Sequence, residues 1–311
     1  MTCYYPITAY RSKTVNDSGK RSLVFTIQDA FSPVKVTVPC SRCVGCRLER
    51  SRQWAIRILC ESKLHDRNIF VTLTYRDDDL PDFKSLRPKD FQDFMKRLRK
   101  CYGDGIRFFH CGEYGDQFGR PHYHAIIFNH DFDDKYQFKK SKHGFPIYRS
   151  DSLEKLWPFG FSEIGSVTFD SAAYVARYIM KKHLGENSIL NYMDIDFGSG
   201  EVLSTRVPEY CTMSRRPGIA KVFFDNNFQD IYRNDFLVIR NGIRVRPPKY
   251  FDKQFEIQCP SDMENLKKFR EKFFRQKCFR DNSTYDRLIV REKCTMSKVS
   301  RLTRTYEGIN D

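Results

Sequence analysis

The residues best suited to chemistry in this 311-residue chain are His122 and His124, with Tyr123 alone between them. The surrounding β-branched and aromatic residues predict a strand, on which residues two apart point to the same face. Both imidazoles would therefore project together, while Tyr123 faces the other side. Two imidazoles held in this way begin a metal site that needs one or two oxygen ligands. Glu113, on the preceding expected strand, is a candidate ligand. Taken alone, the pattern also fits two ordinary strand histidines.

A second pattern is formed by Tyr174 and Tyr178, four residues apart in a segment expected to be helical. Positions i and i+4 of a helix lie nearly above one another, so both phenols would share a face. Lys181 and Lys182 follow on or near that side. A tyrosine can act as a covalent nucleophile, and a nearby cation or metal stabilises charge on the phenolate or on a phosphate. The alternative is a packed aromatic pair beside solvated lysines.

A third pattern is the evenly spaced trio Cys40, Cys43 and Cys46, to which Cys3 could add a fourth thiol. The first residues lack the apolar core of a signal peptide, so we expect a reducing compartment in which cysteines remain thiols or metal ligands. Four thiolates would suit a structural Zn²⁺ ion. An iron–sulfur cluster is disfavoured because Arg50 stands where the usual motif has its fourth cysteine. Free thiols remain the third possibility.

The hydrophobic pattern predicts the elements that must position these residues. Runs of β-branched and aromatic residues predict strands at Ser22–Thr26, Val34–Val38, Ile69–Tyr75, Arg107–Tyr114, His122–Asn129 and Phe161–Val167. Apolar residues at helical spacing predict one helix from the cysteine trio to about Leu64 and another opening at Pro88. A third helix is expected at Ser171–His183, with Asp170 or Ser171 as its N-cap.

These elements predict an α+β fold on an antiparallel sheet flanked by helices. The strands at 107–114 and 122–129 are joined by a loop rich in Gly and Asp, which indicates an antiparallel hairpin. Residues 129–152 are charged and interrupted by Gly and Pro, so we expect an exposed excursion there. Beyond about residue 184 the most distinctive feature is a basic amphipathic tract, Met263–Arg280.

The charge balance points to an anionic partner. Lys and Arg outnumber Asp and Glu by 54 to 39, giving a formal charge of +15. Such a surplus suits nucleic acid or an anionic membrane surface, although an unspecialised basic surface would look the same. No run of 18 apolar residues occurs, so we expect no membrane span. A phosphate-binding Gly-x4-Gly-Lys-Ser/Thr motif is also absent from the sequence, which excludes the usual type of ATPase or helicase.

Three of these segments, in chain order, resemble the motifs of the HUH endonucleases, a superfamily of rolling-circle initiators, relaxases and related transposases. Phe70–Tyr75 looks like the central strand of the first motif. Arg120–His124 resembles the motif in which a hydrophobic residue separates two histidines. Tyr174 and Tyr178, with Lys181, look like the third motif in its two-tyrosine form. Three motifs in order are far more specific than any one of them.

Within that superfamily the chain looks most like the replication initiators of gokushoviruses, single-stranded DNA phages of the microvirus family. The further similarity lies in short segments up to about residue 225: Met1–Pro6, Pro39–Arg47, Ser51–Ala55, Cys111–Gly115 and Met213–Gly218. The resemblance implies a sheet of about five antiparallel strands, a Mg²⁺ or Mn²⁺ ion, and a single-stranded DNA substrate. It also implies that Glu113, nine residues before His122, is the third metal ligand, although this ligand varies across the superfamily.

The resemblance implies a mechanism in which one tyrosine attacks a phosphate, leaving a 5′-phosphotyrosine and a free 3′-hydroxyl, and the second later acts in resealing the displaced strand. We expect residues 1–65 to form a cysteine-rich segment with a basic helix, 66–185 the endonuclease core, and 186–311 a DNA-binding extension. The arginines expected to contact DNA are Arg47, Arg50, Arg52, Arg57, Arg215 and Arg216. The expected partners are single-stranded DNA at the viral origin, a host helicase and a host polymerase, in the host cytoplasm and without a membrane.

Two alternatives remain at this point. A plasmid initiator or mobilisation relaxase would use the same residues in another biological role. A non-catalytic basic DNA-binding protein with a structural zinc would instead bury the histidines and tyrosines as core residues. Covalent attachment of the protein to cleaved DNA separates the second alternative from the first.

Overall fold

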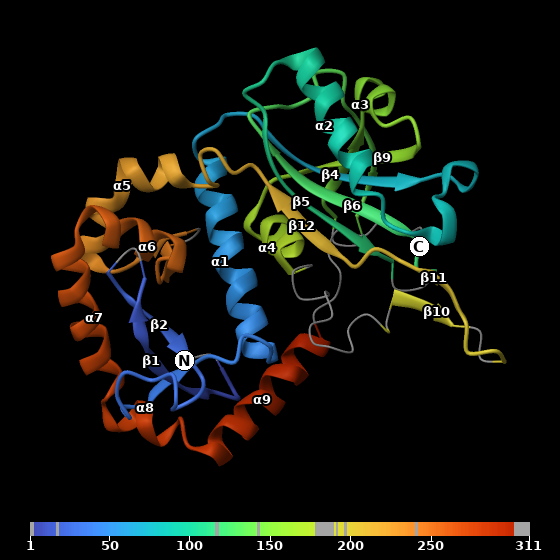
Figure 1. Cartoon of the computed structure of the whole chain (residues 1–311). Coiled ribbons are helices and arrows are strands. Elements are labelled where there is room, and N and C mark those ends of the chain that lie inside the picture. Colours follow the sequence, from blue (N-terminus) through green and yellow to red (C-terminus); the bar gives the residue numbers. More distant parts are fainter. Residues whose placement is uncertain are drawn as a thin grey trace. The chain divides into compact units, whose positions relative to one another are not determined.

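The computed structural model of the chain describes residues 3–16, 19–115, 118–141, 144–177, 190, 192–195, 198–239 and 242–301. These residues form two compact units (Figure 1). The smaller unit contains the described residues up to Glu49 and those from Leu266 onward; the larger contains the described residues of Arg50–Asn265. The three segments expected from the sequence divide the chain differently, and their boundaries remain a prediction.

The larger unit is built on an antiparallel sheet whose strand order in the described residues is β12-β5-β6-β4-β9-β8-β7. The strands are β4 (Asn68–Tyr75), β5 (Arg107–Tyr114), β6 (Pro121–Phe128), β7 (Tyr136–Lys140), β8 (Pro146–Arg149), β9 (Gly160–Ser166) and β12 (Tyr210–Met213). The α+β class with an antiparallel sheet is confirmed, and so is the β5–β6 hairpin. Seven described strands make the sheet wider than the five that the resemblance implied.

Helices cover the sheet on both faces, which explains why the central strands consist of almost continuous buried residues. The helices of the larger unit are α2 (Pro88–Tyr102), α3 (Asp151–Leu156), α4 (Phe169–Arg177), α5 (Lys221–Asn234) and α6 (Lys249–Gln258), and α1 (Val44–Ser62) enters it from the smaller unit. Figure 1 shows α2 on one side of the strands and α4 on the other. Short strand pairs complete the unit: β10 (Met193–Ile195) with β11 (Val202–Thr205), and β13 (Leu237–Val238) with β14 (Arg244–Val245).

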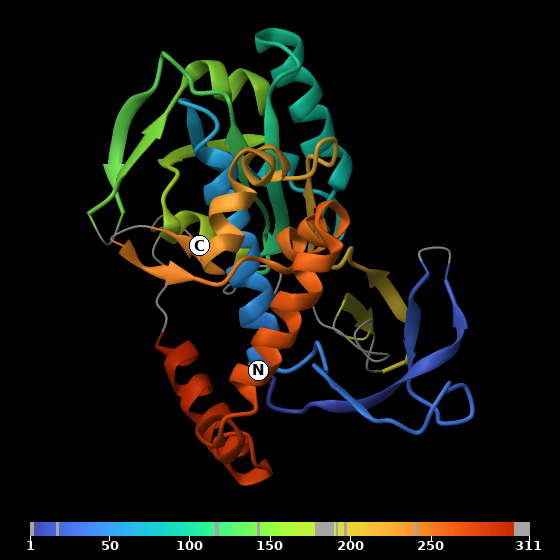
Figure 2. The same ribbon diagram turned by 90° about the vertical axis from the view of Figure 1, so that its left-hand side faces the viewer.

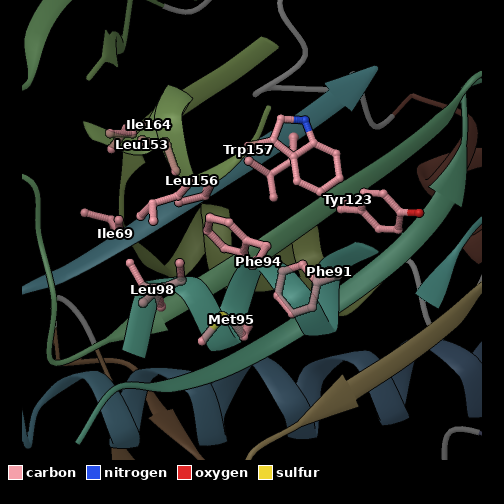
Figure 3. Close-up of a cluster of buried hydrophobic side chains, with 14 of the residues drawn as sticks. Ile69, Phe91, Phe94, Met95, Leu98, Tyr123, Leu153, Leu156, Trp157 and Ile164 are labelled. Atoms are coloured by element: carbon pink, nitrogen blue, oxygen red, sulfur yellow. The ribbon is translucent and has the colours of Figure 1, made fainter. Parts of the chain in front are cut away.

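The main hydrophobic core lies between the sheet and helices α2 and α3 (Figure 3). The apolar stripe of α2 supplies four buried side chains: Phe91, Phe94, Met95 and Leu98. Trp157, directly after α3, is fully buried against them, and its indole N–H donates to the Thr74 carbonyl at 2.9 Å. Burying each large apolar side chain contributes about 1.5–3 kcal/mol, so this layer fixes the sheet on which the candidate site stands.

Tyr123 belongs to this core and not to the face that carries the histidines, as the strand alternation predicted. Its hydroxyl lies 2.9 Å from that of Tyr75 and accepts the backbone N–H of Arg87 at 2.9 Å. Burial raises the pKa of Tyr123 to about 12. The phenol therefore stays neutral and structural, and it is unsuited to act as a nucleophile.

Two local predictions were wrong. The excursion expected at residues 129–152 contains the β7–β8 hairpin, which extends the sheet edge (Figure 2) through pairing of Tyr148 with Ile164. Its alternating aromatic and charged residues place few side chains in the core, so its strand character was hidden. Helix α4 begins at Phe169, earlier than expected, because Thr168 and not Asp170 or Ser171 caps it: Thr168 Oγ1 accepts the Ser171 N–H at 3.1 Å.

The smaller unit contains the antiparallel sheet β2-β1-β3 and helices from the end of the chain (Figure 1). Its elements are β1 (Ile7–Val15), β2 (Arg21–Val24), β3 (Val36–Val38), α8 (Lys277–Asp281) and α9 (Tyr285–Ser300), and α7 (Pro260–Phe274) leads into it. No helix within the described ranges is long and apolar enough to cross a membrane.

Candidate active site

Glu113, His122 and His124 meet on the face of the sheet opposite the main core. The β5–β6 hairpin sets Glu113 directly across from His122. Its Oε1 lies 2.9 Å from Nε2 of His124, and both side chains are buried. The hairpin register therefore brings together the three residues that strand alternation and the resemblance had singled out.

The second ring nitrogen of His124 contacts the neighbouring strand. Nδ1 of His124 lies 3.0 Å from Oγ1 of Thr72, its register partner on β4. The imidazole is thereby held between a carboxylate and a hydroxyl, which fixes the orientation of the ring.

His122 is oriented by the backbone. Its Nδ1 donates to the carbonyl of Arg120 at 2.7 Å, which leaves Nε2 with the lone pair that a metal needs. The His122 and His124 rings are nearly parallel, with centroids 6.4 Å apart. In the part of the chain that the structure describes, three or more ligand atoms within 4.8 Å of one another occur at a set of four cysteines. His122 must therefore move closer to Glu113 before all three residues can bind one ion.

Helix α4 brings Tyr174 to the same face. Thr168 and Ser171 cap its first turn reciprocally, since the Thr168 N–H also donates to Ser171 Oγ at 2.8 Å. The buried Tyr174 ring packs edge-on against His124, with centroids 5.4 Å apart. Tyr178 and Lys181 lie outside the described residues, so the geometry of the tyrosine pair remains a prediction.

Sequence reasoning missed the two residues of β4 that hold His124. Besides Thr72, Phe70 stacks parallel to the His124 ring at 5.8 Å and meets the edge of Tyr174 at 6.0 Å. Gly165 of β9 makes room for Phe70, because a Cβ there would lie 3.2 Å from Phe70 Cδ1. The alternation of β4 assigns Phe70 and Thr72 to one face, but only the β4–β6 register shows that this is the histidine face.

Cys111, the partner of His124 across the hairpin, is a structural neighbour of the site. Burial raises the pKa of its thiol well above the usual range. The thiol stays protonated, and its Sγ donates to the His124 carbonyl at 3.7 Å. It is therefore unsuited to bind a metal as a thiolate.

The arginines expected to bind DNA differ in exposure. Arg50, Arg215 and Arg216 are exposed, whereas Arg47 and Arg52 are half-buried. Exposed guanidinium groups are free to reach a phosphate backbone, so the first three suit the expected role best.

Arg57 is instead a packing residue, contrary to the DNA contact expected for it. Its Nη2 donates to the Ile219 carbonyl at 2.9 Å, and the guanidinium stacks on the rings of Trp54 and Tyr250. Burial lowers the pKa of Arg57 to about 10. The aromatic neighbours that enclose it come from distant parts of the sequence, which is why the helical pattern did not reveal them.

Comparison with known proteins agrees with this arrangement. The family model of the replication-associated protein ORF2 matches residues 68–183, a span that contains β4, the β5–β6 hairpin and α4. The replication-associated protein ORF2 of Spiroplasma virus 4 is 35% identical over 291 residues, covering 87% of this chain and 86% of that protein.

Two further relatives extend the match. The replication-associated protein VP4 of Bdellovibrio phage phiMH2K is 34% identical over 230 residues, covering 71% of this chain and 68% of that protein. The replication-associated protein ORF4 of Chlamydia phage 1 is 33% identical over 238 residues, covering 72% of this chain and 55% of that protein. No solved structure matches the chain.

The fold, the family match and these relatives define a replication-associated protein of a phage. The chain belongs to the ORF2 family of replication-associated proteins, together with those of gokushovirus-type microviruses. The gokushovirus resemblance expected from the motifs is thereby confirmed.

Proposed function

We propose that this protein is a rolling-circle replication initiator of the HUH type, which nicks single-stranded DNA at the viral origin and keeps the cut 5′ end on a tyrosine. One observation carries the proposal: the histidine pair and Glu113 share a buried face with Tyr174, whose ring packs against His124 at 5.4 Å. Membership in a family of replication-associated proteins supports the same conclusion.

Glu113, His122 and His124 are the residues that would hold a divalent ion, Mg²⁺ or Mn²⁺. Their donor set of one carboxylate and two imidazoles fits such an ion, and the hydrogen bond from His122 Nδ1 to the Arg120 carbonyl leaves Nε2 available to it. When bound, the ion supplies a Lewis acid for the scissile phosphate.

The tyrosine step balances without any redox partner. The phenolic oxygen of Tyr174 or Tyr178 forms a bond to phosphorus, and the bond from phosphorus to the 3′ oxygen breaks. The phenol loses its proton and the leaving oxygen gains one, giving a 5′-phosphotyrosine and a 3′-hydroxyl that can prime synthesis. Lys181 stabilises negative charge on the phosphate or the phenolate. Attack by a 3′-hydroxyl on the phosphotyrosine reverses the step and reseals the displaced strand.

The proposed partners follow from what the chain contains. Because its sequence carries no phosphate-binding ATPase motif, the duplex must be opened by a host helicase, and a host polymerase must extend the 3′-hydroxyl. The protein would therefore act in the host cytoplasm.

A strand-cleavage assay tests the proposal. The full chain is incubated with Mn²⁺ and single-stranded oligonucleotides that tile the DNA encoding it. We expect a protein–DNA adduct that survives denaturation, with the protein on the 5′ end of the cut strand. EDTA, His122→Ala or His124→Ala should abolish the adduct, whereas Glu113→Gln should weaken it less completely because water can replace one oxygen ligand.

DNA binding in the absence of metal serves as the control for folding. The histidine variants should still bind the oligonucleotides while failing to cut them. A chain that binds DNA and never forms an adduct would favour the non-catalytic alternative. Full cleavage by the His122→Ala, His124→Ala double variant would overturn the metal assignment. Cutting restricted to a plasmid origin would favour the plasmid initiator or relaxase.

A further inference from the structure

The smaller unit contains a cluster of four thiols that takes no part in the proposed reaction. The Sγ atoms of Cys3, Cys40, Cys43 and Cys46 all lie within 4.8 Å of one another. Cys3 Sγ is 3.5 Å from Cys40 Sγ and 3.9 Å from Cys43 Sγ. Four sulfurs at about 2.3 Å from a central zinc ion are about 3.8 Å apart in a regular tetrahedron. The observed spacing is therefore close to that of a four-thiolate zinc site.

Backbone amides are directed at these sulfurs. The Cys40 N–H donates to Cys3 Sγ at 3.2 Å, and the Cys43 N–H donates to Cys40 Sγ at 3.4 Å. The Tyr4 N–H donates to Cys43 Sγ, also at 3.4 Å. Because N–H donors favour a charged sulfur over a neutral thiol, these contacts favour the thiolate form that binds a metal.

The local fold presents the last two sulfurs at the start of a helix. Ser41 adopts a left-handed backbone conformation with φ of 63°, which turns the chain between Cys40 and Cys43. Helix α1 then begins at Val44, so Cys43 precedes its first turn and Cys46 lies within it. The positive end of the helix dipole adds to the stabilisation of the thiolates.

Other uses of four thiols fit the arrangement less well. A disulfide engages two sulfurs and leaves two, although each of the four has the others within the same 4.8 Å. A four-iron cluster places each thiolate on a separate iron and keeps the sulfurs further apart.

The smaller unit also lacks an adequate hydrophobic core. Its buried apolar side chains, within the described residues, are Cys3, Tyr4, Ala9, Ala30 and Leu288. Units with so little apolar burial generally depend on a disulfide, a metal or a partner for stability. A metal at the cluster would close the stretch of 37 residues between Cys3 and Cys40, which carries the whole β2-β1-β3 sheet.

The N-terminal segment links this cluster to the end of the chain. The Tyr4 hydroxyl lies 2.6 Å from Oγ1 of Thr295, and the Tyr5 hydroxyl donates to Glu292; both partners are on α9. Fixing Cys3 therefore also fixes the two tyrosines that hold α9 to the N-terminal segment.

We propose that Cys3, Cys40, Cys43 and Cys46 bind one structural Zn²⁺ ion, which joins the N-terminal sheet, the start of α1 and the C-terminal helix α9 into a single folded unit. This ion is distinct from the one proposed for the histidine site. The inference does not depend on the proposed function.

Metal analysis of the full chain, purified without chelator, tests the proposal. We expect about one zinc per chain. The Cys43→Ser, Cys46→Ser double variant should lose it. Cys101→Ser, Cys294→Ser is the matched control, because both of those cysteines are exposed and outside the cluster, and it should retain full zinc. The His122→Ala, His124→Ala variant should also retain it, which separates the two metal sites.

Cobalt substitution keeps the test decisive if the serine variant fails to fold. Wild-type protein loaded with Co²⁺ should give the charge-transfer bands of four thiolates and the spectrum of a tetrahedral ion. A zinc chelator should increase hydrogen exchange in β1 and α9 while leaving β4 protected. Zinc-free protein with four reduced cysteines, iron in place of zinc, or a cobalt spectrum without thiolate bands would each overturn the assignment.

Discussion

His124 is contacted at both ring nitrogens, by Glu113 Oε1 at 2.9 Å and by Thr72 Oγ1 at 3.0 Å. A metal at this site would bind the nitrogen that faces Glu113, which leaves Thr72 to fix the ring from the other side. Thr72 is therefore a positioning residue, and its effect should be seen in metal affinity more than in stability.

Thr72→Val keeps the shape of the side chain and removes its hydroxyl. Because such outer contacts typically change metal affinity or activity by about 10–100-fold, we expect the Mn²⁺ concentration for half-maximal cleavage to rise by at least about 10-fold. Thr212→Val is the matched control, since Thr212 Oγ1 contacts Nδ1 of His110 at 2.9 Å on the opposite face. An unchanged Mn²⁺ requirement in Thr72→Val would contradict this role.

His110 makes the stability of the protein depend on pH. Its ring is buried and stacks on Phe91 with centroids 3.4 Å apart, and burial holds its pKa well below the usual 6.5. Below pH 6.5 the unfolded chain therefore binds a proton at His110 that the folded chain does not. Folding stability is complete above that pH and falls by up to about 1.4 kcal/mol per pH unit below it.

The His110→Phe, Thr212→Val double variant removes the titrating ring and its hydrogen-bond partner together. Urea unfolding at pH 7 and pH 5 should give a smaller loss of stability in this variant than in the wild type, because the other titrating groups are shared. An equal loss in both proteins would mean that His110 is protonated in the folded state.

At the scale of elements, the site depends on the alternation of two strands and on the pairing between three. Alternation along β6 was enough to predict that His122 and His124 face away from Tyr123. It was not enough to find Thr72, whose role arises only when β4 pairs with β6 in one register. Pairing between distant segments depends on the whole fold, and a single strand's residues carry little information about it.

The same limit explains the wider sheet. β12 pairs with β5 although about 100 residues separate Thr212 from His110, its register partner. Its four half-buried residues show neither a long apolar run nor a clear alternation. Local signals were reliable for α2, where Pro88 and a regular apolar stripe mark both the start and the buried face.

Helix α4 leads to a prediction about the two tyrosines. If the helix continues through Tyr178, both phenols lie on one face and either can reach the same phosphate. Tyr174→Phe and Tyr178→Phe should then each still form a covalent adduct with an oligonucleotide, while resealing and repeated turnover fail. The double variant should form none. Mass spectrometry of the adduct locates the attached residue.

The opposite outcomes are equally clear. One single variant without any adduct would reduce the mechanism to one nucleophile. An adduct on Tyr123 would refute the assignment, and it is not expected, because burial raises the pKa of that phenol to about 12.

At the scale of the whole molecule, the positive charge is concentrated in the smaller unit. The sequence segments 1–49 and 266–303 contain 19 Lys and Arg against 7 Asp and Glu, a formal +12 of the chain's +15. Residues 50–265 contain 34 against 30. Several large aromatic side chains of the smaller unit are exposed as well: Tyr5, Phe25, Phe31, Phe269 and Tyr285. Basic residues with exposed aromatic rings suit single-stranded DNA, which they hold by its phosphates and bases.

We therefore expect the smaller unit to supply most of the affinity for DNA and the larger unit to supply the chemistry. Four exposed basic residues of the smaller unit offer a direct test: Lys277, Arg280, Lys293 and Lys298. Removing one contact to a phosphate lowers the salt slope of binding to single strands by about 0.7. Replacing all four residues by Gln should reduce the slope by up to about 3 and weaken binding at low salt, while cleavage at saturating DNA persists.

A matched variant on the larger unit removes the same amount of charge from the surface around α2, which lies on the face opposite the histidine site. Its four exposed lysines are Lys84, Lys89, Lys96 and Lys100. Changing them to Gln leaves the net charge equal to that of the first variant, so a general effect of charge would weaken both proteins alike. Fluorescence anisotropy with a labelled oligonucleotide, measured over a range of salt concentrations, compares the two slopes. We expect the α2 variant to bind nearly as the wild type does, because phosphate contacts and not net charge determine the slope. Equal losses in the two variants would remove the special role of the smaller unit in binding DNA.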